Sequence, residues 1–165
     1  TWSVAMMTFM INEQLKLKID AGRAVKIALV HDLAEAITGD IDATLIKNNK
    51  ITKEEKNKLE NNAMLKMKND LPLELGDEIY NLWLEYEKGE SKEARYVKAM
   101  DKIETTIHLI SEGHEKFDDL DLIATYADKC VKSCPELKNF LKVVKEKLKE
   151  EFEKGNIEWK EEYDQ

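Results

Sequence analysis

Apolar residues recur at helical spacing along nearly the whole chain, and no stretch alternates apolar and polar residues as a β-strand would. The two prolines and most of the six glycines stand between the apolar segments, where helices begin and end. Helices are predicted over residues 1–17, 22–37, 72–87, 92–112, 118–132 and 135–154, and one more begins at Thr52. We therefore expect an all-α bundle of about six or seven helices in one compact domain.

Local signals fix some of the boundaries between these helices. Thr52-Lys-Glu-Glu55 is a capping box, in which the two outer side chains satisfy free backbone N–H groups at a helix start. Residues 40–51 are polar and predict a loop. The domain is expected over 1–155, and residues 156–165, which end in EEYDQ, are expected to be a loose acidic tail.

The net charge of −8 argues against a non-specific nucleic-acid binder, because such a protein needs a basic face for phosphates. No apolar run approaches the roughly 20 residues that span a bilayer, so no membrane partner is expected. Cys130 and Cys134 lack a second Cys/His pair nearby and are expected to be reduced thiols. These features favour a cytoplasmic protein.

The stretch KIALVHDLAEAITGDIDA, residues 26–43, places ionisable side chains within an apolar helix. His31, Asp32 and Glu35 interrupt a run that is otherwise typical of a buried segment. Burying a carboxylate costs several kcal/mol unless it is paired or bound to a metal. Imidazole and carboxylate suit a borderline transition ion, but two adjacent ligands need others from elsewhere in the chain.

The helix over 92–112 offers a further ligand in Asp101, which lies at the edge of an apolar stripe. From spacing alone, Asp101 is either a metal ligand or the partner of a nearby lysine. Lys98 and Lys102 flank it and are either cations for a phosphate or ordinary surface residues.

Four other conspicuous side chains are assigned to packing or to solvent. Trp2 and Trp83 lie on apolar stripes and are expected in the core. His108 is expected to be a partly buried core histidine, and His114, after Gly113, to face solvent.

The HDLAE segment, the following TGD and the later VKAMDKIE together resemble the HD-domain metal-dependent phosphohydrolases, in particular their 5′-deoxynucleotidase branch. The resemblance covers roughly residues 1–115. It implies one divalent metal ion (Mn, Co, Mg or Zn) held by His31, Asp32 and Asp101. It also implies a first His ligand immediately before Thr1, so the natural protein is expected to be longer.

By the same resemblance, Glu35 is expected to be the catalytic acid or base, and Asp40 is expected to contact a sugar hydroxyl of the substrate. Each has a simpler alternative: Glu35 orients His31, and Asp40 serves the local turn. The expected activity is removal of the 5′-phosphate from deoxyribonucleoside monophosphates by a metal-activated water, in a homodimer. The alternatives are hydrolysis of another nucleotide or phosphodiester, and a non-catalytic metal-binding helical module.

Overall fold

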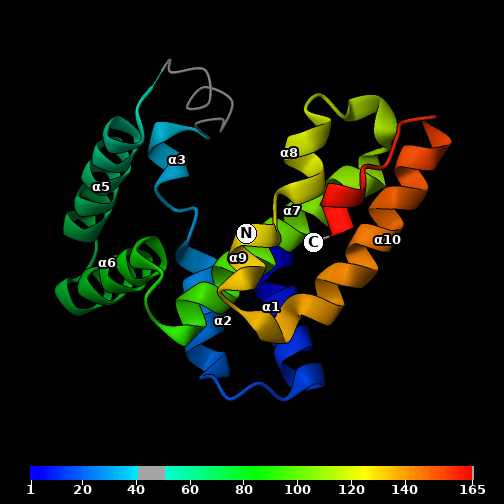
Figure 1. Cartoon of the computed structure of the whole chain (residues 1–165). Coiled ribbons are helices and arrows are strands. Elements are labelled where there is room, and N and C mark those ends of the chain that lie inside the picture. Colours follow the sequence, from blue (N-terminus) through cyan, green and yellow to red (C-terminus); the bar gives the residue numbers. More distant parts are fainter. Residues whose placement is uncertain (41–50, 165) are drawn as a thin grey trace.

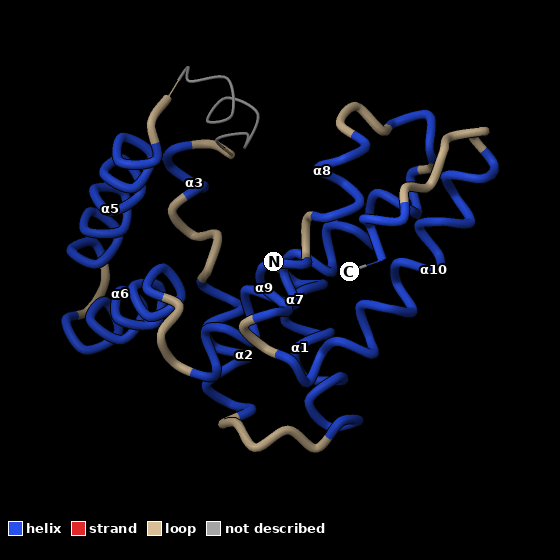
Figure 2. The backbone as a smooth tube through the Cα atoms, in the orientation of Figure 1, coloured by secondary structure: helices blue, strands red, loops and turns tan. Residues whose placement is uncertain are grey.

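The computed structural model describes residues 1–40 and 51–164, and the regular structure of that part is entirely helical (Figures 1 and 2). Its α-helices are α1 (Trp2–Leu15), α2 (Ala21–Val30), α3 (Glu35–Thr38), α5 (Lys53–Asp70), α6 (Leu73–Lys88), α7 (Lys92–Glu112), α8 (Leu120–Thr125), α9 (Asp128–Lys132) and α10 (Lys138–Lys154). Short 3₁₀ turns span His114–Lys116, Pro135–Leu137 and Glu161–Asp164. The all-α prediction is confirmed, while the loop predicted over 40–51 lies almost wholly outside the described residues.

The long helix α7 lies at the centre of the fold. α1 and α2 pack against each other and against α7, and α6 packs on α2 and α7. α10 also packs against α7, on the right of Figure 1, opposite α6. The side chains at the centre have no exposed surface: Ile27, Met64, Val97, Met100, Ile103 and Leu137. Burial of each such side chain contributes roughly 1.5–3 kcal/mol, so this core holds α2 and α7 in a fixed relation.

Local capping signals set the helix starts that were predicted most accurately. The Thr52 and Glu55 side chains make both bonds of the predicted capping box at the start of α5. Ser91 accepts from the backbone N–H of Ala94 and begins α7. These contacts lie within one turn of the chain, so they need no tertiary partner.

The helix predicted over 22–37 is broken within the apolar run. α2 ends at Val30, residues 31–34 form turns, and α3 follows. Backbone bonds here reach only three residues back, as from Leu33 to Val30. The His31 imidazole also bonds to the Ala28 carbonyl, the acceptor that a continuing helix would offer to the N–H of Asp32. The break therefore lies at the ionisable residues themselves.

The chain beyond α10 packs on the domain instead of forming the expected loose tail. Tyr163 is 1% exposed and meets Phe152 and Trp159 edge to face. Leu148 and Phe152 of α10 belong to the same buried cluster as Tyr163. An acidic composition was a poor guide here, because one buried aromatic ring is enough to dock the segment.

Helix α1 carries the main departure from the predicted core. Trp83 is buried, as expected, but Trp2 is 72% exposed. Met6, Phe9 and Met10 are also exposed on α1. None of the helices in residues 1–40 and 51–164 is long and apolar enough to cross a membrane.

Candidate active site

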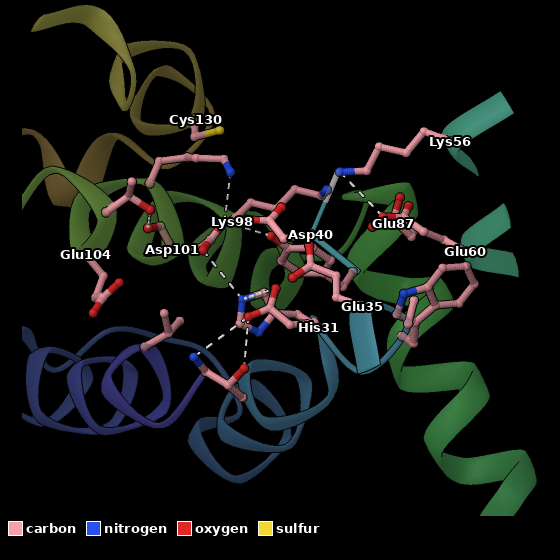
Figure 3. A pocket seen from close by; sticks show the side chains of 18 of the residues that line it. His31, Glu35, Asp40, Lys56, Glu60, Glu87, Lys98, Asp101, Glu104 and Cys130 are labelled. Carbon is pink, nitrogen blue, oxygen red and sulfur yellow. Dashed lines mark hydrogen bonds and ion pairs between the residues drawn. The ribbon is translucent and has the colours of Figure 1, made fainter. Parts of the chain in front are cut away.

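A cavity of about 550 Å³ lies where the break after α2 faces α5, α6 and α7 (Figure 3). All five residues predicted to form a site line it: His31, Asp32, Glu35, Asp40 and Asp101. The first four come from one segment of 10 residues, and Asp101 comes from the middle of α7. The fold thus brings the distant carboxylate to the histidine.

His31 is nearly buried, with 4% of its surface exposed. Its Nδ1 lies 2.7 Å from the Ala28 carbonyl oxygen, an arrangement in which the Nδ1–H donates. Its Nε2 faces Asp32 Oδ1 at 2.9 Å and Asp101 Oδ1 at 3.5 Å. Within the described residues, however, Nε2 has no hydrogen bond of acceptable geometry. The backbone contact therefore directs the second ring nitrogen towards two carboxylates.

The two carboxylates decide the charge of the imidazole. Burial lowers the pKa of His31, but the close, negatively charged carboxylates of Asp101 and Asp32 outweigh it and raise the pKa to about 9. At neutral pH and without a metal, these groups hold a proton at Nε2. A divalent cation can take the place of that proton.

Asp101 makes a different contact with each oxygen. Oδ1 faces His31, while Oδ2 accepts from Tyr86 Oη at 3.0 Å and pairs with Lys102 Nζ at 3.0 Å. Burial alone would raise the pKa of Asp101, but His31 and Lys102 hold it well below its usual range. The lysine partner considered from the sequence is therefore present, and the other oxygen of Asp101 is directed at His31.

Asp32 lies nearer to solvent, with about a third of its side chain exposed. Its Oδ2 accepts a hydrogen bond of 2.9 Å from the Thr1 hydroxyl. Burial raises the pKa of Asp32, but His31 and Thr1 more than offset it, so the pKa is lowered. Asp32 therefore presents a charged carboxylate at the wall of the cavity.

The donor set fits a divalent metal ion in type and direction. One imidazole nitrogen without a proper hydrogen bond and two ionised carboxylates suit Mn, Co or Zn, and the Nδ1–carbonyl bond is a common way to orient a ligating histidine. Among the described residues, no three His, Cys, Asp or Glu side chains already surround a common point. Asp32 and Asp101 are directed at the imidazole nitrogen instead.

Glu35 begins α3 and faces the same cavity (Figure 3). Burial and the negative charges of Asp32 and Asp40 raise the pKa of Glu35 to about 7. A carboxyl group with this pKa can accept or donate a proton near neutral pH. Asp40 is exposed at the cavity edge.

Tyr86 is the site residue that sequence reasoning missed. It lies on α6, is 7% exposed and reaches Asp101 with its hydroxyl, and its ring centroid is 5.1 Å from that of His31. Tyr86 continues the helical spacing of Leu82 and Trp83 on α6, and all three side chains are buried. A buried tyrosine hydroxyl requires a polar partner, and that requirement was the available signal.

Comparison with known proteins identifies relatives of the chain. The family model described as "HD domain" matches residues 1–154. The chain is 47% identical over 87 residues to 5′-deoxynucleotidase HDDC2 of Dictyostelium discoideum, covering 53% of this chain and 44% of that protein. It is 40% identical over 103 residues to the Homo sapiens protein of that name, covering 62% and 47%. With 5′-deoxynucleotidase hdd1 of Schizosaccharomyces pombe the identity is 36% over 121 residues, covering 71% and 57%.

The chain thus spans about half the length of these curated relatives. Among solved structures, a predicted metal-dependent phosphohydrolase from Magnetospirillum magnetotacticum has a similar fold, with a TM-score of 0.73. The two chains are 22% identical, and the match covers 94% of this chain and 76% of the other.

Proposed function

Because the chain belongs to the HD-domain family, we propose that it is a metal-dependent phosphohydrolase that removes the 5′-phosphate from deoxyribonucleoside monophosphates. The relatives named 5′-deoxynucleotidases support this substrate class. The observation that carries the proposal is the orientation of His31. Its Nε2 points at Asp32 and Asp101 in a cavity large enough for a small ligand.

His31, Asp32 and Asp101 would hold one divalent ion. When bound, that ion supplies positive charge for the phosphate and lowers the pKa of a nearby water. Tyr86 and Lys102 keep Asp101 ionised and oriented through its second oxygen, and Ala28 keeps the Nδ1 proton of His31 away from the cavity. The contribution of the fold is to fix these side chains before substrate arrives.

Glu35 is the proposed acid and base. Hydrolysis adds water to phosphorus, breaks the bond from phosphorus to the 5′ oxygen, and requires one proton to reach the departing nucleoside hydroxyl. A carboxyl group with a pKa of about 7 can take a proton from water and return one to the 5′ oxygen. Asp40, at the cavity edge, is proposed to accept a hydrogen bond from a sugar hydroxyl.

Two further expectations remain part of the proposal. A homodimer is proposed from the resemblance, and light scattering after size exclusion measures its mass. A cytoplasmic location is likewise proposed, and fractionation of cells tests it.

Phosphate release from a panel of nucleoside monophosphates tests the function. The protein is stripped of metal and resupplied with Mn²⁺, Co²⁺, Mg²⁺ or Zn²⁺. Metal-dependent release from deoxynucleotides that exceeds release from ribonucleotides is expected, and Glu35→Gln should abolish it. A folded protein that releases no phosphate with any metal would contradict the proposal.

A further inference from the structure

Two lysines of α7 enter the cavity, and they differ in what they contact. Lys102 Nζ pairs with Asp101 Oδ2 at 3.0 Å and donates to Tyr126 Oη at 3.1 Å. Burial lowers the pKa of Lys102, but Asp101 and Tyr126 outweigh it and hold the pKa well above its usual range. Lys102 is therefore occupied in neutralising the proposed metal ligand.

Lys98, one turn earlier on α7, is also largely withdrawn from solvent but has no such partner. Within residues 1–40 and 51–164, no carboxylate lies within ion-pair distance of its Nζ and no hydrogen bond is made there. Its Nζ lies over the Tyr86 ring, 4.1 Å from the centroid. Burial lowers the pKa of Lys98, and the more distant charge of Glu87 only partly opposes this. A partly desolvated ammonium group without a counter-charge is stabilised more by binding an anion than a fully hydrated ammonium group is.

Two contacts fix the path of the Lys98 side chain. Gly89, which ends α6 with a positive φ of 64°, lies against the lysine stem. A Cβ at Gly89 would lie 3.2 Å from Lys98 Cε and 3.4 Å from Cδ. The end of the side chain then rests on Tyr86, whose ring packs against His31 and whose hydroxyl contacts Asp101. Tyr86 therefore contacts Lys98 and two of the proposed metal ligands, and holds the lysine beside them.

We infer that the ammonium group of Lys98 binds the non-bridging oxygens of the substrate's phosphate group. Tyr86 is the residue that positions the Lys98 side chain for this contact. The inference rests on the proposed function and narrows its substrate class to a phosphomonoester dianion. The cavity wall carries Asp32, Glu35 and Asp40, which repel such an ion. A preplaced cation beside the metal ligands offsets that repulsion.

A purely structural role for Lys98 makes a different prediction. If the lysine served only to fill the space over Tyr86, methionine would replace it with little change in ligand affinity, because its stem has similar length and flexibility. The affinity for inorganic phosphate therefore separates the two roles, and it does so without turnover.

Isothermal titration with inorganic phosphate tests the inference on wild type, Lys98→Met, Lys98→Arg and Lys92→Met, all loaded with the same metal ion. Lys92 lies on the exposed start of α7 and does not line the cavity, so Lys92→Met is the matched control. Lys98→Met should bind phosphate about 10- to 100-fold more weakly, as for loss of one charge-assisted contact. Lys98→Arg should recover most of the affinity, and Lys92→Met should equal wild type.

Labelling of surface amines on the wild-type protein gives a measurement that needs no variant. Phosphate should protect Lys98 from acetylation, read by mass spectrometry, and should leave Lys92 unprotected. Equal phosphate affinity in folded Lys98→Met, or an unprotected Lys98, overturns the inference. Lys98-dependent phosphate binding without deoxynucleotide hydrolysis overturns the proposed function instead, so the two failures are distinguishable.

Discussion

Two regions of the molecule bury charged side chains, and they differ in how those charges are paired. In the C-terminal region, Lys145 is 8% exposed, pairs with Asp128 Oδ1 at 2.7 Å and also donates to the Tyr163 carbonyl. One cation there meets one carboxylate. In the site, one imidazole meets two carboxylates, those of Asp32 and Asp101.

The difference shows that buried charge alone does not identify a functional site. The C-terminal pair is balanced, so nothing further is needed to offset the cost of its burial. The site has one more carboxylate than its imidazole can neutralise, and Lys102 is recruited to Asp101. An excess of directed donors beside a cavity is the property that calls for a cation.

The largest expected effect follows from removing one carboxylate charge in the site. Asp101→Asn should keep the fold but lower kcat/KM by about 10³-fold, because it removes charge that would hold the metal. Metal affinity should fall as well. Steady-state kinetics measure the loss of kcat/KM, and titration with Mn²⁺ measures the loss of metal affinity. Retained metal affinity in this variant would contradict the assignment of Asp101 as a ligand.

The matched change in the C-terminal region should act on stability instead. Asp128→Asn leaves Lys145 buried without a counter-charge and should lower the free energy of unfolding by about 3 kcal/mol. Urea denaturation measures this change, and kcat at a temperature where the protein is folded should match wild type. A loss of kcat larger than the loss of folded protein would contradict a purely stabilising role for the Lys145–Asp128 pair.

A smaller effect is expected from the tyrosine hydroxyls. Tyr86→Phe removes the bond to Asp101 but keeps the ring beside His31, so metal affinity should fall about 10-fold. Tyr163→Phe removes a hydroxyl that donates to Asp121 in the C-terminal region. Its metal affinity, measured in the same titration, should equal that of wild type. Equal metal affinities of the Tyr86→Phe and Tyr163→Phe variants would contradict the role of Tyr86 in positioning Asp101.

The smallest effects are opposite pH dependences of stability. The pKa of Glu35 is raised from 4.5 to about 7, so the folded state binds more protons than the unfolded state over that range. Stability contributed at Glu35 therefore falls as pH rises from 4.5 to 7. Lys154 and His114 lower the pKa of Glu151 to about 2, so its contribution is present above pH 4.5 and is lost as pH falls towards 2.

Thermal unfolding of metal-free protein against pH checks both signs. Relative to wild type, Glu35→Gln should become more stable as pH rises through 4.5 to 7. Glu151→Gln should be less stable above pH 4.5, and this difference should shrink on acidification. The same sign for both variants would contradict the two environments described for these carboxyl groups.

Features determined within one helical turn were predictable from the sequence. The start of α5 follows from its capping box, and α7 spans the predicted 92–112 because Ser91 and Gly113 bound it. The break at 31–34 was not predictable, since the apolar run continues through it and the fold there depends on the His31 side chain. His31, Asp32, Glu35 and Asp101 could be found because ionisable groups in apolar stripes are conspicuous.

The environments of the other two histidines show where periodicity fails. His108 was expected at the core margin, but its side chain is 63% exposed beside Glu112. His114 was expected in solvent, yet it contacts Glu151 on α10 at 3.1 Å. A position at the edge of a stripe turns in or out according to the neighbouring helix, and one helix's sequence does not contain that information. Tyr86 was missed because the polar partner of its hydroxyl, Asp101, lies on another helix.

The contacts of Tyr86 have a consequence for how this sequence can diverge. A single ring touches His31 and Lys98, and its hydroxyl bonds to Asp101, so substitutions at these positions should not act independently. A lineage that replaces the tyrosine would disturb all three neighbours in one step and would need a compensating change elsewhere. Substitutions at positions 31, 86, 98 and 101 are therefore expected to occur together, at a rate limited by the position that tolerates change least.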